Sequence, residues 1–349
     1  MPAMTAQSIS LCTLLYAACF TTKGAFAFTT GGTRTISAPI AKRHEWQQVV
    51  DIELPDTDLL FERIGMASPL AKMVMEGDAS GGFEAIDDNA KHPEVKWKKV
   101  EDNKRKTVHR IDRADSFQNV RTPLLRFRSS IKGPCIGERF SNMLMDLEER
   151  KKWDDQVAKV EEMYPIEDLD AVNAMLGDQE KYGTCTRLGV GYTQTKSGIL
   201  SPREQLTLGG MQEYENGATI LWGTEMEDYH NHLLPEGQRH TRAKSHLFAA
   251  TLAPTGPDSF DVEYLLQMEV GGGVPHFLST PALTDAVRKL FHHAKTYFEG
   301  DEVDRYLKSR QQEQQQVDYS EIELLSTLDE DLLEAEIDID EFIRITTTS

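Results

Sequence analysis

The sequence is poor in cysteine and in basic residues, and it has no apolar run as long as a membrane span. Of the 4 cysteines, Cys135 and Cys185 lie outside the leading segment, and their spacing fits neither a disulfide framework nor a zinc site. With 38 Lys and Arg against 57 Asp and Glu, the net charge of −19 argues against nucleic acid as a partner and against docking of a basic patch on anionic lipid. Any membrane contact is expected to be transient, local and apolar.

Motifs of catalysis and of cofactor binding are also missing. The glycines at residues 271–273 lack the spacing of the Walker and Rossmann fingerprints, so nucleotide binding is rejected. No cysteine or carboxylate completes a metal-ligand spacing with the histidines, including the pair His292 and His293. Ser201 and Ser279 stand outside any nucleophile-elbow context. We therefore predict no catalytic residue, no cofactor and no metal, and we expect a protein that is not an enzyme.

The first 44 residues have the composition of targeting segments. Residues 9–20 form an apolar run shorter than the ~20 residues of a membrane span, and Ala25 and Ala27 supply small residues at a cleavage position before Phe28. Residues 1–27 are therefore expected to be a signal peptide. Residues 28–44 are rich in hydroxyl and basic side chains, as in a transit peptide. Together they resemble the bipartite presequence of algae with secondary plastids, which implies a plastid (chloroplast) location reached by the secretory route; an endomembrane-lumen or secreted protein is the alternative.

Hydrophobic periodicity predicts an α+β arrangement of strands and helices between two extensions. The N-terminal extension, residues 45–92, has one amphipathic helix at 59–75 and a flexible glycine-rich linker at 77–82. Strand patterns occur at 95–100, 106–111, 122–131, 157–164, 183–193, 205–212, 219–225, 241–252 and 260–270, and helix patterns at 135–152 and 282–298. Residues 301–349 form a polar and then acidic tail, which is expected to be disordered or to bind a protein partner through a weak helix.

The run at residues 148–157 combines charged side chains with Trp153. Arg150 and Asp154 stand four residues apart, so on a helix they share one face and can form an ion pair. An exposed pair would belong to an ordinary solvated helix face and contribute under ~1 kcal/mol to stability. A buried arginine, with its rigid fork of donors, would instead be a receptor for carboxylate or phosphate oxygens. The residues alone leave both interpretations open.

Short motifs follow this run in a fixed order. They are Arg150-x-x-Trp-Asp, Pro-Arg-Glu at 202–204, the lone Arg242, Glu-Val-Gly-Gly-Gly-Val-Pro at 269–275, and a last long helix. In that order the chain resembles the START (steroidogenic acute regulatory protein-related lipid-transfer) domains over residues 93–300. The resemblance implies a helix-grip (START/Bet v 1-like) fold, in which a curved antiparallel sheet around a long C-terminal helix encloses a lipid cavity. It further implies a carrier that binds a single lipid and transfers it between membranes.

The resemblance is closest to the phosphatidylcholine-transfer branch, whose matching arginine contacts the lipid phosphate. It implies that Arg150 binds phosphate while Asp154 holds the arginine. Three positions match the aromatic cage that binds choline in that branch, and they are occupied here by Tyr192, Gln205 and His246. Only one of the three is aromatic, so the cage is incomplete.

A phospholipid is favoured over a sterol as the ligand. Cholesterol-binding members of the family have a buried acid-base pair, and the matching positions here are Val190 and Gly209. The resemblance adds Arg242 to the expected ligand-binding residues. Two alternatives remain: a helix-grip enzyme (cyclase or hydrolase) acting on a hydrophobic substrate, and a lipid-sensing adaptor that signals through the acidic tail.

An apolar loop is the predicted point of membrane contact. Residues 226–239 join two strand patterns and contain Tyr229, Leu233, Leu234 and Pro235. If this loop lies at the mouth of the cavity, its tip would dip into the bilayer surface.

Overall fold

The computed structural model describes residues 34–38, 50–78, 81–86, 93–166, 168–196, 201–226, 233–234 and 240–310. The chain divides into two compact units, Met1–Glu299 and Gly300–Ser349. Of the second unit, residues 301–310 are helical. The predicted signal peptide lies outside the described residues, and so does the tail beyond residue 310. Of the predicted transit segment, the structure describes only the strand β1 (Arg34–Ala38), which pairs with β2 (Val50–Leu54).

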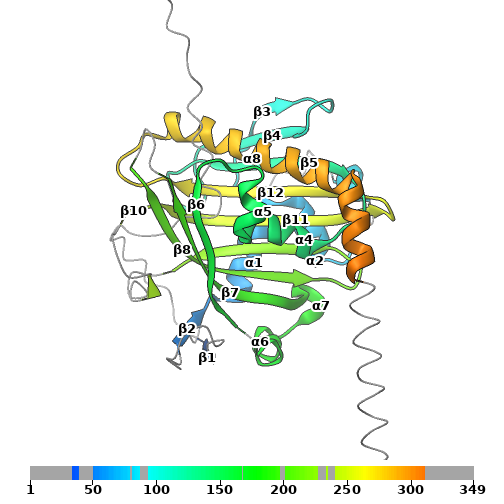
Figure 1. Cartoon of the computed structure of the whole chain (residues 1–349), viewed down its shortest axis with the longest axis horizontal. Helices are drawn as coiled ribbons and strands as arrows, with labels where there is room; N and C mark the ends of the chain where they lie inside the picture. The colour runs from blue at the N-terminus through cyan, green and yellow to red at the C-terminus, as the bar shows by residue number, and fades with distance from the viewer. Residues whose placement is uncertain are drawn as a thin grey trace, which may run out of the picture. The chain divides into compact units, whose positions relative to one another are not determined.

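A 10-stranded sheet is the centre of the first unit (Figure 1). In sheet order its main path is β3 (Lys98–Asp102), β4 (Arg110–Ala114), β5 (Leu124–Lys132), β12 (Ser259–Glu269), β11 (Lys244–Gly256), β9 (Thr219–Glu225), β8 (Arg203–Glu213), β7 (Thr184–Thr195) and β6 (Val157–Pro165). Every neighbouring pair on this path is antiparallel, and the two-residue β10 (Thr241–Arg242) pairs parallel with β8. Each of the nine predicted strands has a counterpart in the sheet.

One face of the sheet, here called the inner face, is covered by α4 (Gly137–Met145), α5 (Leu147–Lys151) and α8 (His276–Phe298). Figure 1 shows α8 crossing in front of the strands. Phe291 of α8 packs against Tyr264 of β12, with ring centroids 6.2 Å apart, and against Phe140 of α4 at 6.3 Å. The predicted α+β fold, with a last long helix packed across an antiparallel sheet, is confirmed.

The helix expected at 135–152 is two helices. Asp146 separates them because its backbone is extended, with φ −91° and ψ 129°, and its side chain accepts a hydrogen bond from Glu149 N, the cap of α5. The turn at Asp146 changes the direction of the chain at the end of α4. As a result, Arg150 and Trp153 can contact the last carbonyl groups of α4.

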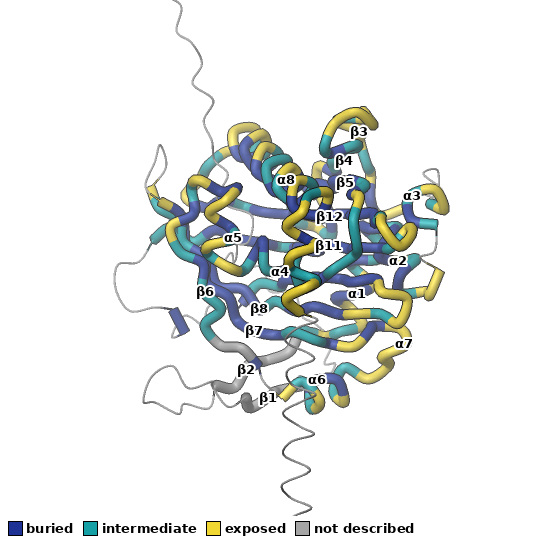
Figure 2. Tube along the Cα trace, turned by 45° about the vertical axis from the view of Figure 1, so that its right-hand side comes forward, coloured by how far each residue is buried: buried dark blue, intermediate teal, exposed yellow. Residues whose placement is uncertain are grey.

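The opposite, outer face is covered by α1 (Thr57–Ala67), α2 (Pro69–Met75) and α3 (Gly82–Ala85). Buried residues of α1, such as Phe61 and Ile64, share one apolar cluster with Leu188 and Leu206 of the sheet. The single helix expected at 59–75 is broken at Ser68, since the residue before a proline disfavours the helical conformation. Ser68 then caps α2 by accepting a hydrogen bond from Ala71 N at 2.9 Å. Figure 2 shows the strands buried between the two helical layers.

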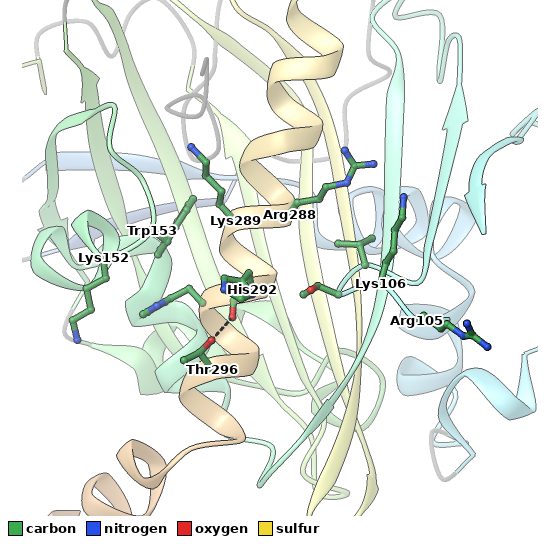
Figure 3. A pocket seen from close by; sticks show the side chains of 11 residues that line it. Arg105, Lys106, Lys152, Trp153, Arg288, Lys289, His292 and Thr296 are labelled. Carbon is green, nitrogen blue, oxygen red and sulfur yellow. Dashed lines mark hydrogen bonds between the residues drawn. The ribbon is translucent and has the colours of Figure 1, made fainter. Parts of the chain in front are cut away.

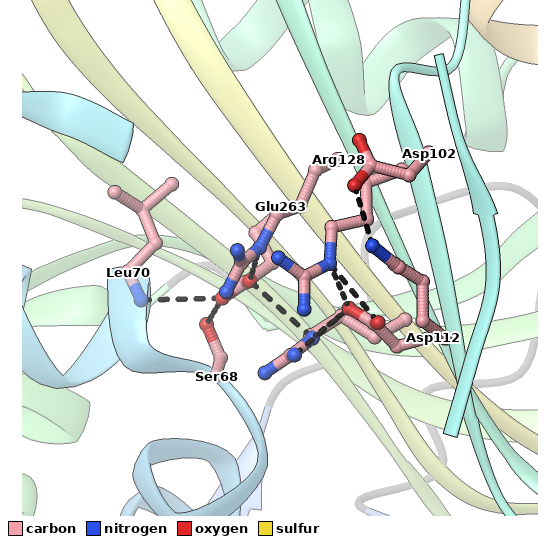
Figure 4. Close-up of polar contacts among 9 residues, drawn as sticks. Ser68, Leu70, Asp102, Asp112, Arg128 and Glu263 are labelled. Carbon is pink, nitrogen blue, oxygen red and sulfur yellow. Dashed lines mark hydrogen bonds and ion pairs between the residues drawn. The ribbon is translucent and has the colours of Figure 1, made fainter. Parts of the chain in front are cut away.

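A buried ionic network fixes α2 to the outer face (Figure 4). Glu263 of β12 is fully buried and accepts hydrogen bonds from Arg128 Nε at 2.6 Å, Ser68 Oγ at 2.5 Å and Leu70 N at 3.2 Å. The carboxylate thus sits at the N-terminus of α2, where it meets free backbone N–H groups. Residues 57–78 were expected in an extension that precedes the domain. The structure instead makes them a layer of the same unit, because the outer face of the sheet is apolar and needs a cover.

Two short helices between β6 and β7 were not predicted. They are α6 (Leu169–Leu176) and α7 (Gln179–Tyr182). Asp168 and Asp178 cap their first turns, and glycines at positive φ follow both helices. These caps are local signals in the sequence, but each helix is too short to show a clear helical period.

Candidate functional site

Arg150 and Asp154 form a buried ion pair on the inner side of the sheet. Both side chains are fully buried, and Arg150 Nε lies 3.1 Å from Asp154 Oδ2. Arg150 Nη1 donates to the Leu144 carbonyl at 3.1 Å, and the guanidinium lies 5.3 Å from the centre of the Trp153 ring. Trp153 Nε1 in turn donates to the Met143 carbonyl at 2.9 Å. The predicted burial and pairing of Arg150 are confirmed.

One nitrogen of this guanidinium has an unused donor. Arg150 Nη2 is buried and has no hydrogen-bond partner among the described residues. A buried donor without an acceptor typically costs about 1–3 kcal/mol, so an anionic oxygen at this point would be favourable. Burial raises the pKa of Asp154 above its ordinary value even though Arg150 opposes the shift. Asp154 Oδ1 also accepts from Gln156 N at 3.1 Å, which orients the carboxylate toward the arginine.

Gln205 and His246 lie on the same inner face. Gln205 Nε2 donates to Thr207 Oγ1 at 2.8 Å, and Gln205 Oε1 is buried without a partner in the described part of the chain. Thr207 and Phe248 lie on the same face of the sheet, because a Cβ atom placed on Gly223 between them would come within 3.2 Å of both side chains. Phe248 packs on Tyr264, which contacts Phe291 of α8, so this face is the inner one. His246 Nδ1 lies 3.4 Å from Glu225 Oε2, two residues after Gly223 on β9.

Tyr192 and Arg242 lie on the outer face, which corrects the expected ligand site. Tyr192 pairs with Leu206 in the β7–β8 register, and both belong to the apolar cluster under α1. Tyr192 Oη donates to Glu204 Oε2 at 3.4 Å, and Arg242 Nη2 lies 3.7 Å from Glu204 Oε1. Successive residues of a strand point to opposite faces, so Gln205 and Leu206 cannot contribute to one pocket. Tyr192 therefore cannot form a cage with Gln205 and His246.

The predicted membrane-contact loop is only partly described. Leu233 and Leu234 are 2% and 7% exposed and belong to the outer-face apolar cluster. The expectation that both leucines project from a loop tip is wrong, because their side chains contribute to the core. Tyr229 and Pro235 lie outside the described residues.

The inner-face space between α4 and strands β7 to β9 is small. It has a volume of about 20 Å³ and is lined by Leu144, Gly189, Gly209 and Met211, among others. That is room for about one water molecule. A lipid chain can occupy this part of the layer only if α4 moves away from the sheet.

A second, larger hollow was not predicted from the sequence. It lies along the outward side of α8, has a volume of about 730 Å³ and includes Trp153 in its lining (Figure 3). Its other residues come from the β3–β4 turn, the end of α5 and α8, so no local pattern in the sequence links them. The described residues contain no group of three or more metal-ligating side chains, and none of the described helices is long and apolar enough to cross a membrane.

No family model and no curated protein matches the chain. Solved structures to which it is similar include human STARD10, with 19% identity over 61% of this chain and 78% of that chain, at a TM-score of 0.43. Human StAR-related lipid transfer protein 5 shows 16% identity over 68% of this chain and 97% of that chain, at 0.46. A STAR-related lipid transfer protein from Xanthomonas axonopodis shows 14% identity over 58% and 99%, at 0.41.

Proposed function

We propose that the protein is a START-like carrier that binds one phospholipid on the inner side of its sheet and transfers it between membranes. The observation that carries the proposal is the free Nη2 donor of the buried Arg150. A guanidinium that is already fixed by Asp154 and the Leu144 carbonyl presents its remaining donor without further loss of side-chain freedom. A lipid phosphate is the anion that also brings apolar chains suited to the aromatic inner layer.

The geometry changes the expected headgroup recognition. With Tyr192 on the outer face, an aromatic cage for choline has no support among the residues predicted for it. Gln205 and His246 supply an amide and an imidazole on the inner face, which suit hydrogen bonds to a polar headgroup. We therefore propose recognition of the phosphate first, with a headgroup other than choline permitted. Plastid delivery through the secretory route stays a prediction from residues 1–44.

The test is native mass spectrometry of lipids that co-purify with the full chain. Arg150→Leu should reduce the phospholipid-bound fraction about tenfold or more, since a hydrogen bond to a charged group contributes about 1.5–3 kcal/mol. Arg126→Leu is the matched control, because Arg126 is also buried but lies on the outer face with Asp112. The bound fraction is measured per folded protein for each variant. Phospholipid retained by Arg150→Leu at the wild-type level would contradict the proposal, as would wild-type protein that carries no phospholipid.

A further inference from the structure

The hollow along α8 is a basic groove. Its Lys and Arg side chains are Arg105 and Lys106 from the β3–β4 turn, Lys152 after α5, and Arg288 and Lys289 on α8. His292 and His293 also line it, and no Asp or Glu does. Figure 3 shows α8 running between Lys152 and Trp153 on one side and Lys106 and Arg105 on the other. Segments more than 180 residues apart in the sequence thus place their cations around one hollow of about 730 Å³.

Carboxylates behind the groove neutralise only part of this charge. Glu101 is shared by Arg288 at 2.7 Å and Lys106 at 3.0 Å. Glu149 is shared by Lys152 at 2.9 Å and Arg139 at 3.3 Å. Lys289 lies 3.6 Å from Asp155 and 3.9 Å from Asp285. The five Lys and Arg side chains of the groove thus meet four carboxylates, and Glu149 is also shared with Arg139 outside the groove, so the groove keeps a small positive excess. The cations of these pairs keep 36% to 54% of their side-chain surface exposed, so lipid phosphates can compete with the carboxylates for them.

Two large apolar side chains stand exposed on the same helix. Phe277 is 73% exposed and Leu278 52% exposed, in the first turn of α8. Phe277 and Arg288 are 11 residues apart, which is close to three helical turns and places them on one side of α8, roughly 16 Å apart. An aromatic and a leucine that are this exposed and adjacent on one helix mark a contact surface.

We propose that this side of α8 docks on an anionic lipid bilayer, with Phe277 and Leu278 inserted among the headgroups and the basic groove lying on their phosphates. The inference deepens the proposed carrier function by naming the surface on which lipid is collected or released. A small phosphorylated ligand would explain the groove but not the apolar pair. A bilayer interface offers both partners, apolar at depth and anionic at the surface.

The net charge of −19 does not oppose this docking. Residues 301–349 hold 15 acidic and 4 basic side chains, so more than half of the net negative charge belongs to the tail. Electrostatic attraction falls off within about one Debye length, roughly 8 Å at physiological salt, so the charge of the groove acts on the surface that it touches. The sequence-based argument against a basic patch therefore fails for a local groove.

The experiment is co-sedimentation of the full chain with vesicles of phosphatidylcholine alone or with about a third phosphatidylserine. Wild type should bind the anionic vesicles, bind neutral ones weakly, and lose affinity as salt rises. Arg105→Gln with Lys106→Gln and Lys289→Gln should weaken binding at least tenfold, since each cation near the surface contributes to attraction. Lys72→Gln with Lys159→Gln and Lys181→Gln removes three cations elsewhere, whose side chains are 63%, 42% and 54% exposed, and should bind like wild type.

The apolar pair is tested separately. Phe277→Ser with Leu278→Ser should weaken vesicle binding but keep its salt dependence, whereas Leu59→Ser, at a 37% exposed position of α1, should have no effect. Equal binding by the groove variant and wild type overturns the inference. Binding of wild type to neutral vesicles that does not depend on salt also overturns it. A third contrary result is binding of inorganic phosphate in the groove together with normal vesicle binding by the Phe277→Ser, Leu278→Ser variant. Co-purified lipid is measured in the same samples: lipid carried without docking refutes only the docking surface, and docking without carried lipid refutes only the carrier function.

Discussion

The Arg150–Asp154 pair should respond asymmetrically to removal of either partner. Asp154→Asn keeps the shape of the side chain but leaves the guanidinium of Arg150 charged and fully buried, with the Leu144 carbonyl as its remaining strong acceptor. Arginine does not lose its proton in a protein, so Arg150 stays charged in this variant. Arg150→Leu leaves a buried Asp154, which can take up a proton. Burial already raises its pKa in the intact pair.

The magnitudes follow from this difference. Breaking a buried pair from the carboxylate side typically costs about 3–5 kcal/mol of unfolding free energy, at any pH where Arg150 stays charged. In Arg150→Leu the cost is limited by protonation of Asp154. From an ordinary pKa of about 3.9, protonation at pH 7 costs about 4 kcal/mol and at pH 5 about 1.5 kcal/mol. A buried carboxyl whose pKa is raised in the folded state destabilises the protein more as the pH rises. Lowering the pH should therefore increase the free energy of unfolding of Arg150→Leu by up to about 1.4 kcal/mol per pH unit.

The assay is urea unfolding of wild type and both variants at pH 7 and pH 5. Relative to wild type, Arg150→Leu should regain stability at pH 5, and Asp154→Asn should not. Two results would refute the reasoning: the same pH dependence in both variants, or melting of both variants like wild type. The second result would mean that the pair is accessible to water, and it would remove the physical basis of the phosphate site as well.

Glu263 and the buried leucines give two further predictions. Burial alone would raise the pKa of Glu263, but Arg128, Arg126 and Ser68 lower it overall. At pH 7, wild type should be more stable than Glu263→Gln by about 3–5 kcal/mol. This difference should shrink as the pH falls below about 4, because the carboxylate then takes up a proton. Urea unfolding at stepwise lower pH measures it, and a constant difference would contradict the prediction. Leu233→Asp with Leu234→Asp should lower the melting temperature strongly, because both side chains are buried, and unchanged melting would show that these leucines are exposed after all.

Local geometry is what the sequence could determine. The alternation of apolar residues identified the nine long strands, and the helical spacing identified α8, because both periods are properties of the backbone itself. The Arg150–Asp154 pair followed from the same rule, since residues four apart on a helix must share a face. The sequence could not state whether that face was buried, because the answer depends on the contact of α5 with α4 and the inner face.

Tertiary structure decided the composition of the sites. The β7–β8 register contains a shift between Cys185 and Arg187, and such a shift sets which face every later residue of the strand occupies. Tyr192 therefore lies on the outer face with α1, whereas Gln205 lies on the inner face. The apolar outer face needed a cover, and the helices α1, α2 and α3, which were expected in an N-terminal extension, supply it as part of the same unit. The basic groove brings together residues 105, 152 and 289 from three elements. Total charge is a sum over the chain, whereas a binding surface depends on which charges the fold places side by side.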